Sequence, residues 1–157
     1  MNSQIINCVL LPVSHGHLLL PNTAVASMLS FIKPQELDNA PAWLLGMINW
    51  QGWYLPLVSW TTVMDTDARE ALDNARIAIV KSIQQDSKLP YFAIISQGFP
   101  RLISISEKDL EQIDDDPFAD SISGAEDCLL ARIQWENKTV DLPALPELSA
   151  YISKNMH

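Results

Sequence analysis

The chain has 157 residues, 48% of them hydrophobic, which is enough for the core of one ordinary domain without disulfide or metal support. Its 19 acidic and 10 basic residues give a formal net charge of −9. Nucleic acids and anionic membrane surfaces are therefore excluded as expected partners, because binding to phosphate groups requires clustered cations.

Short apolar runs separated by turn residues follow one another along the chain, which favours an all-β barrel or sandwich over an alternating βα fold. Two helices are predicted, at Asp67–Glu70, where an acidic cap precedes a glutamate, and from Pro146, where Leu148, Tyr151 and Ile152 share one face. We expect both helices to connect or cover strands. The predicted strands are Ile5–Leu11, Leu18–Leu20, Ala24–Ile32, Leu44–Trp50, Trp53–Ser59, Arg76–Ile83, Tyr91–Ile95, Leu102–Ile105, Leu129–Trp135 and Thr139–Leu142.

The start of the chain does not read as a signal peptide. Met1–Gln4 carries no positive charge, and the apolar run from Ile5 is soon broken by Pro12. No run approaches the ~20 apolar residues of a membrane span. We therefore expect a cytoplasmic protein in which Cys8 and Cys128 stay reduced and pack in the core.

One pattern occurs twice, 85 residues apart. Residues 44–57 and 129–142 share Leu, Leu, Ile, Trp and Leu in register. Each copy reads as an apolar strand, a polar turn and a second strand, with turns predicted at Gln51-Gly52 and Asn137-Lys138. The sequence therefore predicts two similar β-hairpins.

Two hairpins at one spacing predict two similar barrels. A weaker echo, at an offset of 71, relates Ile6–Leu10 to Ile77–Lys81. We expect a single domain over residues 3–155, in which one barrel carries the hairpin 44–59 and the other the hairpin 129–142.

An acidic stretch precedes the second predicted hairpin. Ser106–Asp127 holds nine of the 19 acidic residues, with Lys108 as its only base. The interpretation is a solvated connector between strands. Asp114–Asp116 could instead bind a metal, but the stretch lacks the EF-hand spacing.

Catalytic motifs are missing from the sequence. The chain has three histidines, and His15-Gly16-His17 lies at a predicted turn, where the pair could hold a metal or could be plain polar turn residues. No nucleophile elbow, zinc-protease motif or glycine-rich phosphate loop occurs. We predict a protein that is not an enzyme and has no cofactor or metal. The alternative is a small ligand- or metal-binding barrel, or an unrecognised enzyme, that uses the acidic stretch or the histidine pair.

Four of the five tryptophans lie within 18 residues: Trp43, Trp50, Trp53 and Trp60. Strand alternation places Ile48 and Trp50 on one face. The tryptophans could close the barrel interior, or they could form an exposed aromatic patch for a protein partner. Both interpretations stand for Trp50 and Trp53, whereas Trp60 is assigned to the core.

The segment from Ala40 to Gly52, with Pro56-Leu57-Val58, resembles the signature of the CheW-like family. In that signature a glycine, two apolar residues and an asparagine precede an Arg-Gly turn, and a strand led by proline follows. The matching residues are Gly46, Ile48, Asn49, Gly52 and Pro56. The segments 20–29, 75–80, 92–95 and 129–142 also resemble the family.

This resemblance implies two intertwined five-stranded, SH3-like β-barrels with short connecting helices. It also implies an adaptor that binds the regulatory domain of a CheA-type histidine kinase and the cytoplasmic tip of a methyl-accepting chemoreceptor, without nucleic acid and without membrane insertion. Val25 and Leu29 are expected to be half core. The expected contact residues are Val25, Met28, Leu29, Trp50, Gln51 and Trp53.

The chain departs from the family pattern by losing charges. Gln51 replaces the turn arginine, Ser59 replaces an aspartate after the second strand, and Ser27 and Gln97 also stand where acids are expected. These losses are similar to those of specialised adaptors, and the chain most resembles the PilI- and ChpC-type proteins of type IV pilus (twitching motility) signalling. A milder alternative is an auxiliary or inhibitory protein that binds only one partner.

Overall fold

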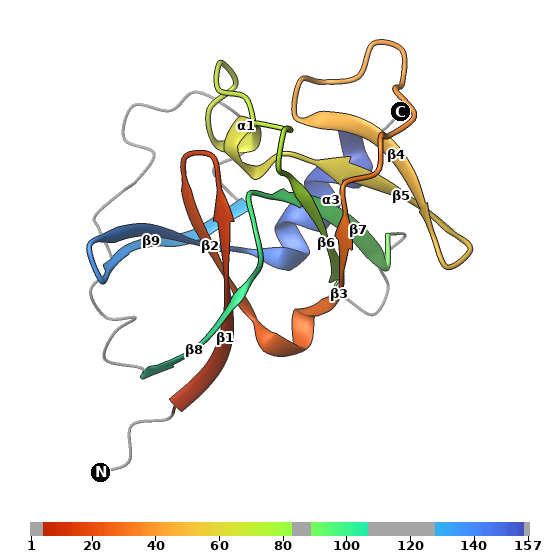
Figure 1. The fold of residues 1–157 in the computed structure, drawn as a ribbon. Coiled ribbons are helices and arrows are strands. Elements are labelled where there is room, and N and C mark those ends of the chain that lie inside the picture. Colours follow the sequence, from red (N-terminus) through yellow and green to blue (C-terminus); the bar gives the residue numbers. More distant parts are fainter. Residues whose placement is uncertain (1–4, 83–88, 107–127, 156–157) are drawn as a thin grey trace.

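The computed structural model describes residues 5–82, 89–106 and 128–155. These residues form two five-stranded sheets and a few short helices (Figure 1). The helical elements are η1 (Asn22–Ala24), α1 (Trp60–Met64) and α3 (Leu145–Asn155). The strands are β1 (Ile5–Val13), β2 (Gly16–Pro21), β3 (Val25–Ser30), β4 (Leu44–Trp50), β5 (Trp53–Val58), β6 (Arg76–Lys81), β7 (Tyr91–Ser96), β8 (Arg101–Ser106), β9 (Leu129–Trp135) and β10 (Lys138–Pro143). All ten predicted strands are therefore confirmed, with small shifts at their ends.

The two sheets have the same strand arrangement. The central sheet, built from the middle of the chain, has the order β3-β6-β7-β5-β4. The terminal sheet, built from both ends of the chain, has the order β8-β1-β2-β10-β9. Position by position, β8 corresponds to β3, β1 to β6, β2 to β7, β10 to β5 and β9 to β4. The terminal sheet is therefore a copy of the central sheet in which the chain runs through β8, β9 and β10 and then β1 and β2. Both sheets also contain one parallel pair, β5 with β7 and β10 with β2.

Both sequence echoes correspond to equivalent strands. The repeat at offset 85 relates β4 and β5 to β9 and β10, and the echo at offset 71 relates β1 to β6. The equivalence extends to single hydrogen bonds. Ser59 N donates to Trp43 O at 2.9 Å, and Ala144 N donates to Cys128 O, 85 residues on, at 2.7 Å. A helix follows the hairpin in each copy.

The predicted all-β fold with two five-stranded units is confirmed, but the ladders leave each sheet open rather than closed into a barrel. In the central sheet one isolated bridge joins Gln35, beyond β3, to Met47 on β4. Its two hydrogen bonds measure 2.8 and 2.9 Å. This bridge brings the two edges of the central sheet towards each other.

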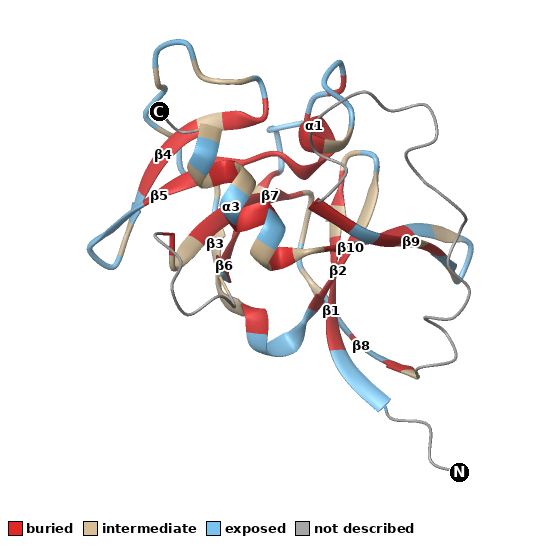
Figure 2. Ribbon diagram, turned by 180° about the vertical axis from the view of Figure 1, so that it is seen from behind, coloured by how far each residue is buried: buried red, intermediate tan, exposed pale blue. Residues whose placement is uncertain are grey.

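Three apolar clusters hold the fold together. Figure 2 shows buried residues along strands of both sheets. One lies within the central sheet, one lies within the terminal sheet, and the largest lies between the sheets and under α3. Alternate residues of β6 and β7 enter different clusters: Ile77 and Ala93 lie in the central-sheet cluster, whereas Ala78 and Ile94 lie between the sheets. Burial on both faces explains why these strands are continuous apolar runs.

Two local predictions are wrong. Residues 67–70 form no helix, because the Glu70 side chain turns inward to Ser14 instead. The helix of this region is α1, which begins after Ser59, whose Oγ accepts a hydrogen bond from Thr62 N at 3.1 Å.

The second error concerns the turn of the second hairpin. Glu136 and Asn137 have φ of 48° and 63°, so they form the turn, and Lys138 already pairs with Trp135 in the ladder. The turn is therefore displaced by one residue from the predicted Asn137-Lys138. Two positive φ values suit the right-handed twist of the flanking strands.

Other predictions of packing are confirmed. In α3, Leu148 and Ile152 are buried, and the Tyr151 ring centroid lies 5.4 Å from that of Trp43. Cys8 and Cys128 are buried and form no disulfide bond with each other, and burial raises the pKa of the Cys8 thiol. The acidic connector, including Asp114–Asp116, falls in residues 107–127, which lie outside the described part of the chain, so it stays a prediction.

Candidate protein-docking surfaces

Aromatic side chains gather at the tip of the β4–β5 hairpin. The turn consists of Gln51 and Gly52, with φ of 49° and 85°, so that Trp50 and Trp53 are paired across it. The ring centroids of Trp50 and Trp53 lie 5.2 and 5.3 Å from that of Tyr91 on β7, both in edge-on contact. We call Trp50, Trp53 and Tyr91 the aromatic rim.

The aromatic rim is partly open to solvent. Trp53 keeps 45% of its surface exposed, whereas Trp50 is half-buried against the central-sheet cluster. Tyr54, the next residue on β5, is also exposed, and its hydroxyl donates to Gln35 Oε1 at 2.8 Å. The exposed-patch interpretation therefore fits Trp53, and the core interpretation fits Trp60, which is 1% exposed.

The family-signature residues shape this hairpin. Gly46 is buried at a bulge of β4, where a Cβ atom would lie 2.4 Å from the backbone oxygen of Gln35. Ile48 and Pro56 are buried, and Asn49 is exposed. Gly52 supplies a positive φ in the turn.

The equivalent end of the terminal sheet has a different chemistry. Trp135 takes the place of Trp50, and the charged groups of Arg101 and Lys138 lie 5.7 and 5.9 Å from the centroid of its ring. The pKa of His17, on the neighbouring β2, is lowered by burial and then by the Lys138 charge. The two hairpin ends therefore match in backbone arrangement but differ in side-chain character.

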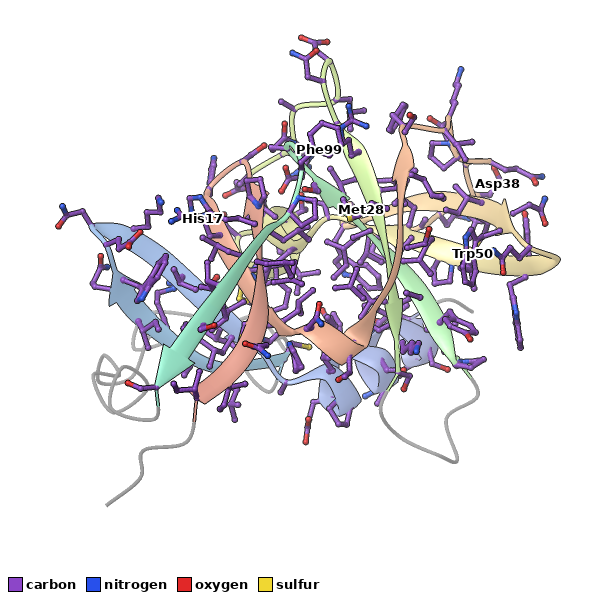
Figure 3. The ribbon with its side chains drawn as sticks, turned by 60° about the horizontal axis from the view of Figure 1, so that its bottom comes forward. His17, Met28, Asp38, Trp50 and Phe99 are labelled. Atoms are coloured by element: carbon purple, nitrogen blue, oxygen red, sulfur yellow. The ribbon has the colours of Figure 1, made fainter. Side chains whose placement is uncertain are left out.

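A second group of apolar side chains lies on or beside the edge strands β3 and β8, and Figure 3 labels two of its members, Met28 and Phe99. On β3, Val25 and Met28 are half-buried against the cluster between the sheets, and Leu29 packs on the central-sheet cluster. The predicted β3 residues therefore do not share one face.

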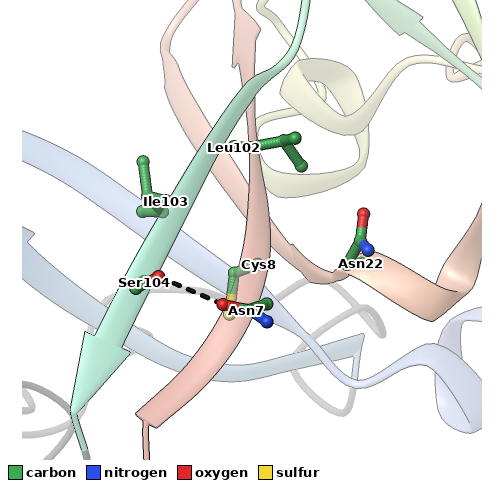
Figure 4. A pocket seen from close by; sticks show the side chains of 6 residues that line it. All are labelled: Asn7, Cys8, Asn22, Leu102, Ile103 and Ser104. Atoms are coloured by element: carbon green, nitrogen blue, oxygen red, sulfur yellow. Dashed lines mark hydrogen bonds between the residues drawn. The ribbon is translucent and has the colours of Figure 1, made fainter.

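Sequence reasoning missed the most exposed residues of this region. Leu102 on β8 is 72% exposed, and Phe99, just before β8, is 69% exposed. Leu102 lines a pocket together with Asn22 of η1, and Figure 4 shows its side chain pointing away from that of Ile103. We call Met28, Phe99 and Leu102 the β3–β8 surface. The alternation of Leu102 with buried Ile103 is the signal that could have identified Leu102.

The predicted contact residues thus fall into two separate groups. Trp50, Gln51 and Trp53 lie together at the hairpin tip, and the β3 residues lie at the opposite edge of the same sheet. A family model described as the CheW-like domain matches residues 7–127. The chain belongs to the CheW-like family.

One solved structure similar to this CheW-like chain is that of the scaffolding protein TtCheW from Thermoanaerobacter tengcongensis. The two chains are 17% identical, with a TM-score of 0.68, and the match covers 90% of each chain. At this identity the likeness shows the fold. A comparison with curated proteins finds no match.

The histidine pair of this CheW-like chain lies at the turn between β1 and β2. His15 is exposed and His17 is half-buried. Within the described ranges, no group of three or more His, Cys, Asp or Glu side chains could hold a metal ion. No helix in the same part of the chain is long and apolar enough to cross a membrane.

Proposed function

We propose that this CheW-like protein is a non-catalytic, cytoplasmic adaptor that couples chemoreceptors to a CheA-type histidine kinase. The observation that carries the proposal is the pair of exposed apolar surfaces, the aromatic rim and the β3–β8 surface, on one frame. The rim lies on strands of the central sheet, whereas the β3–β8 surface has Met28 on an edge of the central sheet and Leu102 on an edge of the terminal sheet. An adaptor needs two docking surfaces held at a fixed geometry, and large exposed aromatic groups are typical interface anchors.

We assign the aromatic rim to the regulatory domain of the kinase. It lies on the hairpin that carries the family signature, and Tyr91 holds both tryptophan rings from the side. The β3–β8 surface is assigned to the receptor tip, because apolar residues beside a pocket suit the apolar face of a helix.

We expect Trp53→Ala to weaken binding to the kinase regulatory domain at least about tenfold, because an exposed aromatic anchor is lost. Titration calorimetry of the wild-type and variant proteins measures this loss. Phe99→Ala is the matched control, since it removes an exposed aromatic residue from the other surface, and it should leave kinase binding unchanged. Equal affinities for wild type and Trp53→Ala would refute the assignment of the rim.

The converse holds for the receptor. We expect Phe99→Ala to weaken binding of a receptor-tip fragment at least about tenfold while Trp53→Ala has no effect. Fluorescence anisotropy of a labelled fragment measures the affinity. If only one of the two partners binds the wild-type protein, the one-partner auxiliary or inhibitory role replaces the adaptor role.

We further propose that the chain serves a type IV pilus system of the PilI or ChpC type. The uncharged residues at four family positions, Ser27, Gln51, Ser59 and Gln97, support this. Gln51 is exposed in the turn beside the aromatic rim, and Ser59 is buried as the cap of α1. Deletion of the gene should then impair twitching rather than swimming, and an unchanged twitching zone would contradict the assignment.

A further inference from the structure

A buried carboxylate joins the two sheets. Glu70 lies between α1 and β6 and is only 9% exposed. Its carboxylate accepts hydrogen bonds from Ser14 N at 3.0 Å and Ser14 Oγ at 2.7 Å, in the β1–β2 turn. It also accepts from Thr61 Oγ1 on α1 and from Gln97 Nε2, at 2.7 Å, just after β7. Three segments from both sheets therefore meet at one side chain.

Further bonds tie the same segments together. Gln97 Nε2 donates to Ala71 O at 2.6 Å, and Gln97 N donates to Pro12 O, on β1, at 2.8 Å. Ser14 Oγ accepts from Ala71 N at 3.0 Å. Gln97 is thus held through both its backbone and its side chain, two residues before Phe99.

The donor set favours a carboxylate at residue 70. Ser14 N and Gln97 Nε2 can only donate, and the hydroxyls of Ser14 and Thr61 complete the set. A glutamine would keep one acceptor oxygen but lose the charge that strengthens these hydrogen bonds. Gln97 stands where the family pattern carries an acid. A carboxylate at residue 97 would repel the carboxylate of Glu70. In this chain the acid is at residue 70, before β6, and the amide that donates to it is at residue 97, after β7.

The connection between β7 and β8 carries the exposed ring of Phe99. The guanidinium of Arg76, on β6, lies over this ring, 3.8 Å from its centroid. Phe99 is therefore presented on a segment fixed at Gln97 and supported at Arg76. A docking residue held in place before binding loses less conformational entropy on association.

We infer that Glu70 is a positioning residue, whose carboxylate fixes the β7–β8 connection to the β1–β2 turn and so presents Phe99 in one orientation. The role of the fixed segment in partner binding rests on the proposed function. The attachment of the β7–β8 connection to the β1–β2 turn does not depend on the proposed function, and it can be measured on the protein alone.

The test is amide hydrogen exchange by NMR on the full chain. In Glu70→Gln, exchange at Ser14 and Gln97 should accelerate at least about tenfold, while Leu57, in the middle of β5, keeps its wild-type rate. The variant Gln97→Glu places a second carboxylate beside Glu70 and beside Ala71 O, so it should accelerate exchange at the same two positions. Gln97→Met removes the two hydrogen bonds that Gln97 Nε2 donates, to Glu70 and to Ala71 O, and it should give the same local acceleration if Glu70→Gln does not fold.

The inference is overturned if Glu70→Gln exchanges like wild type, or if every strand accelerates equally. A receptor-tip fragment supplies the second readout. Its affinity should fall about three- to tenfold in Glu70→Gln. Local acceleration without any fragment binding to the wild type would uphold the positioning role and refute the receptor assignment.

Discussion

We expect Trp60→Ala to lower the free energy of unfolding by about 3–5 kcal/mol, the usual cost of emptying a large buried aromatic site. Trp60 is among the largest fully buried side chains and lies in the cluster between the two sheets. Its Nε1 donates to Asp141 Oδ2, on β10 of the terminal sheet, at 2.9 Å. The substitution therefore removes both apolar packing and a buried hydrogen bond from the contact between the sheets.

Trp60→Phe separates these two contributions. It keeps most of the apolar volume but removes the donor, so the loss should be about 1–2 kcal/mol. Asp141 retains its two hydrogen bonds from Arg132, at 2.6 and 3.1 Å, in both variants. Urea unfolding followed by circular dichroism measures both values. A loss below about 1 kcal/mol for Trp60→Ala would show that this site collapses without leaving a cavity.

Gly46→Ala should cost about 3 kcal/mol or more, because strain and overpacking add, at about 1–3 kcal/mol each. Gly46 has φ of 144°, and an added Cβ would lie 2.4 Å from Gln35 O and 2.9 Å from Pro34 Cβ. Both neighbours belong to the segment that bridges to Met47, so the alanine would have to push this backbone away. Thermal and urea unfolding measure the loss.

Gly52→Ala is the matched control. Gly52 also has a positive φ, of 85°, but a Cβ there would meet no atom within 4 Å. Only the backbone strain remains, at about 1–2 kcal/mol. If the two alanine variants were equally stable, the close approach of the Gln35 segment would not be the reason for glycine at residue 46.

The strands were predictable because apolar runs bounded by turn residues define them locally. The repeat at offset 85 also indicated two similar units before any contact was known. The helix at residues 67–70 failed for a tertiary reason, since the donors that draw Glu70 inward lie at Ser14 and Gln97, 56 and 27 residues away. Local capping patterns carry no information about such distant partners.

The candidate surfaces were predictable only in part. Trp50 and Trp53 stood out because they flank a two-residue turn, but Tyr91, which holds them, belongs to another strand and shares no sequence pattern with them. Phe99 was missed because a single aromatic residue in a short connection shows no periodicity. Its exposure depends on how the β7–β8 connection is anchored, which only the fold reveals.

The strand arrangement of the terminal sheet has a consequence for synthesis on the ribosome. β1 pairs with β8, so that Ile5 lies opposite Ser106, and β2 pairs with β10. The β1–β2 hairpin emerges first but lacks its neighbours until about a hundred further residues have been made, whereas β3 to β7 are contiguous. The central sheet can therefore form during translation while the first hairpin waits with unpaired edges, and late, non-local pairing of this kind is slow. A chain that stops before β9 would still pair β1 with β8 but would leave β2 without β10, as an unpaired edge exposed to aggregation.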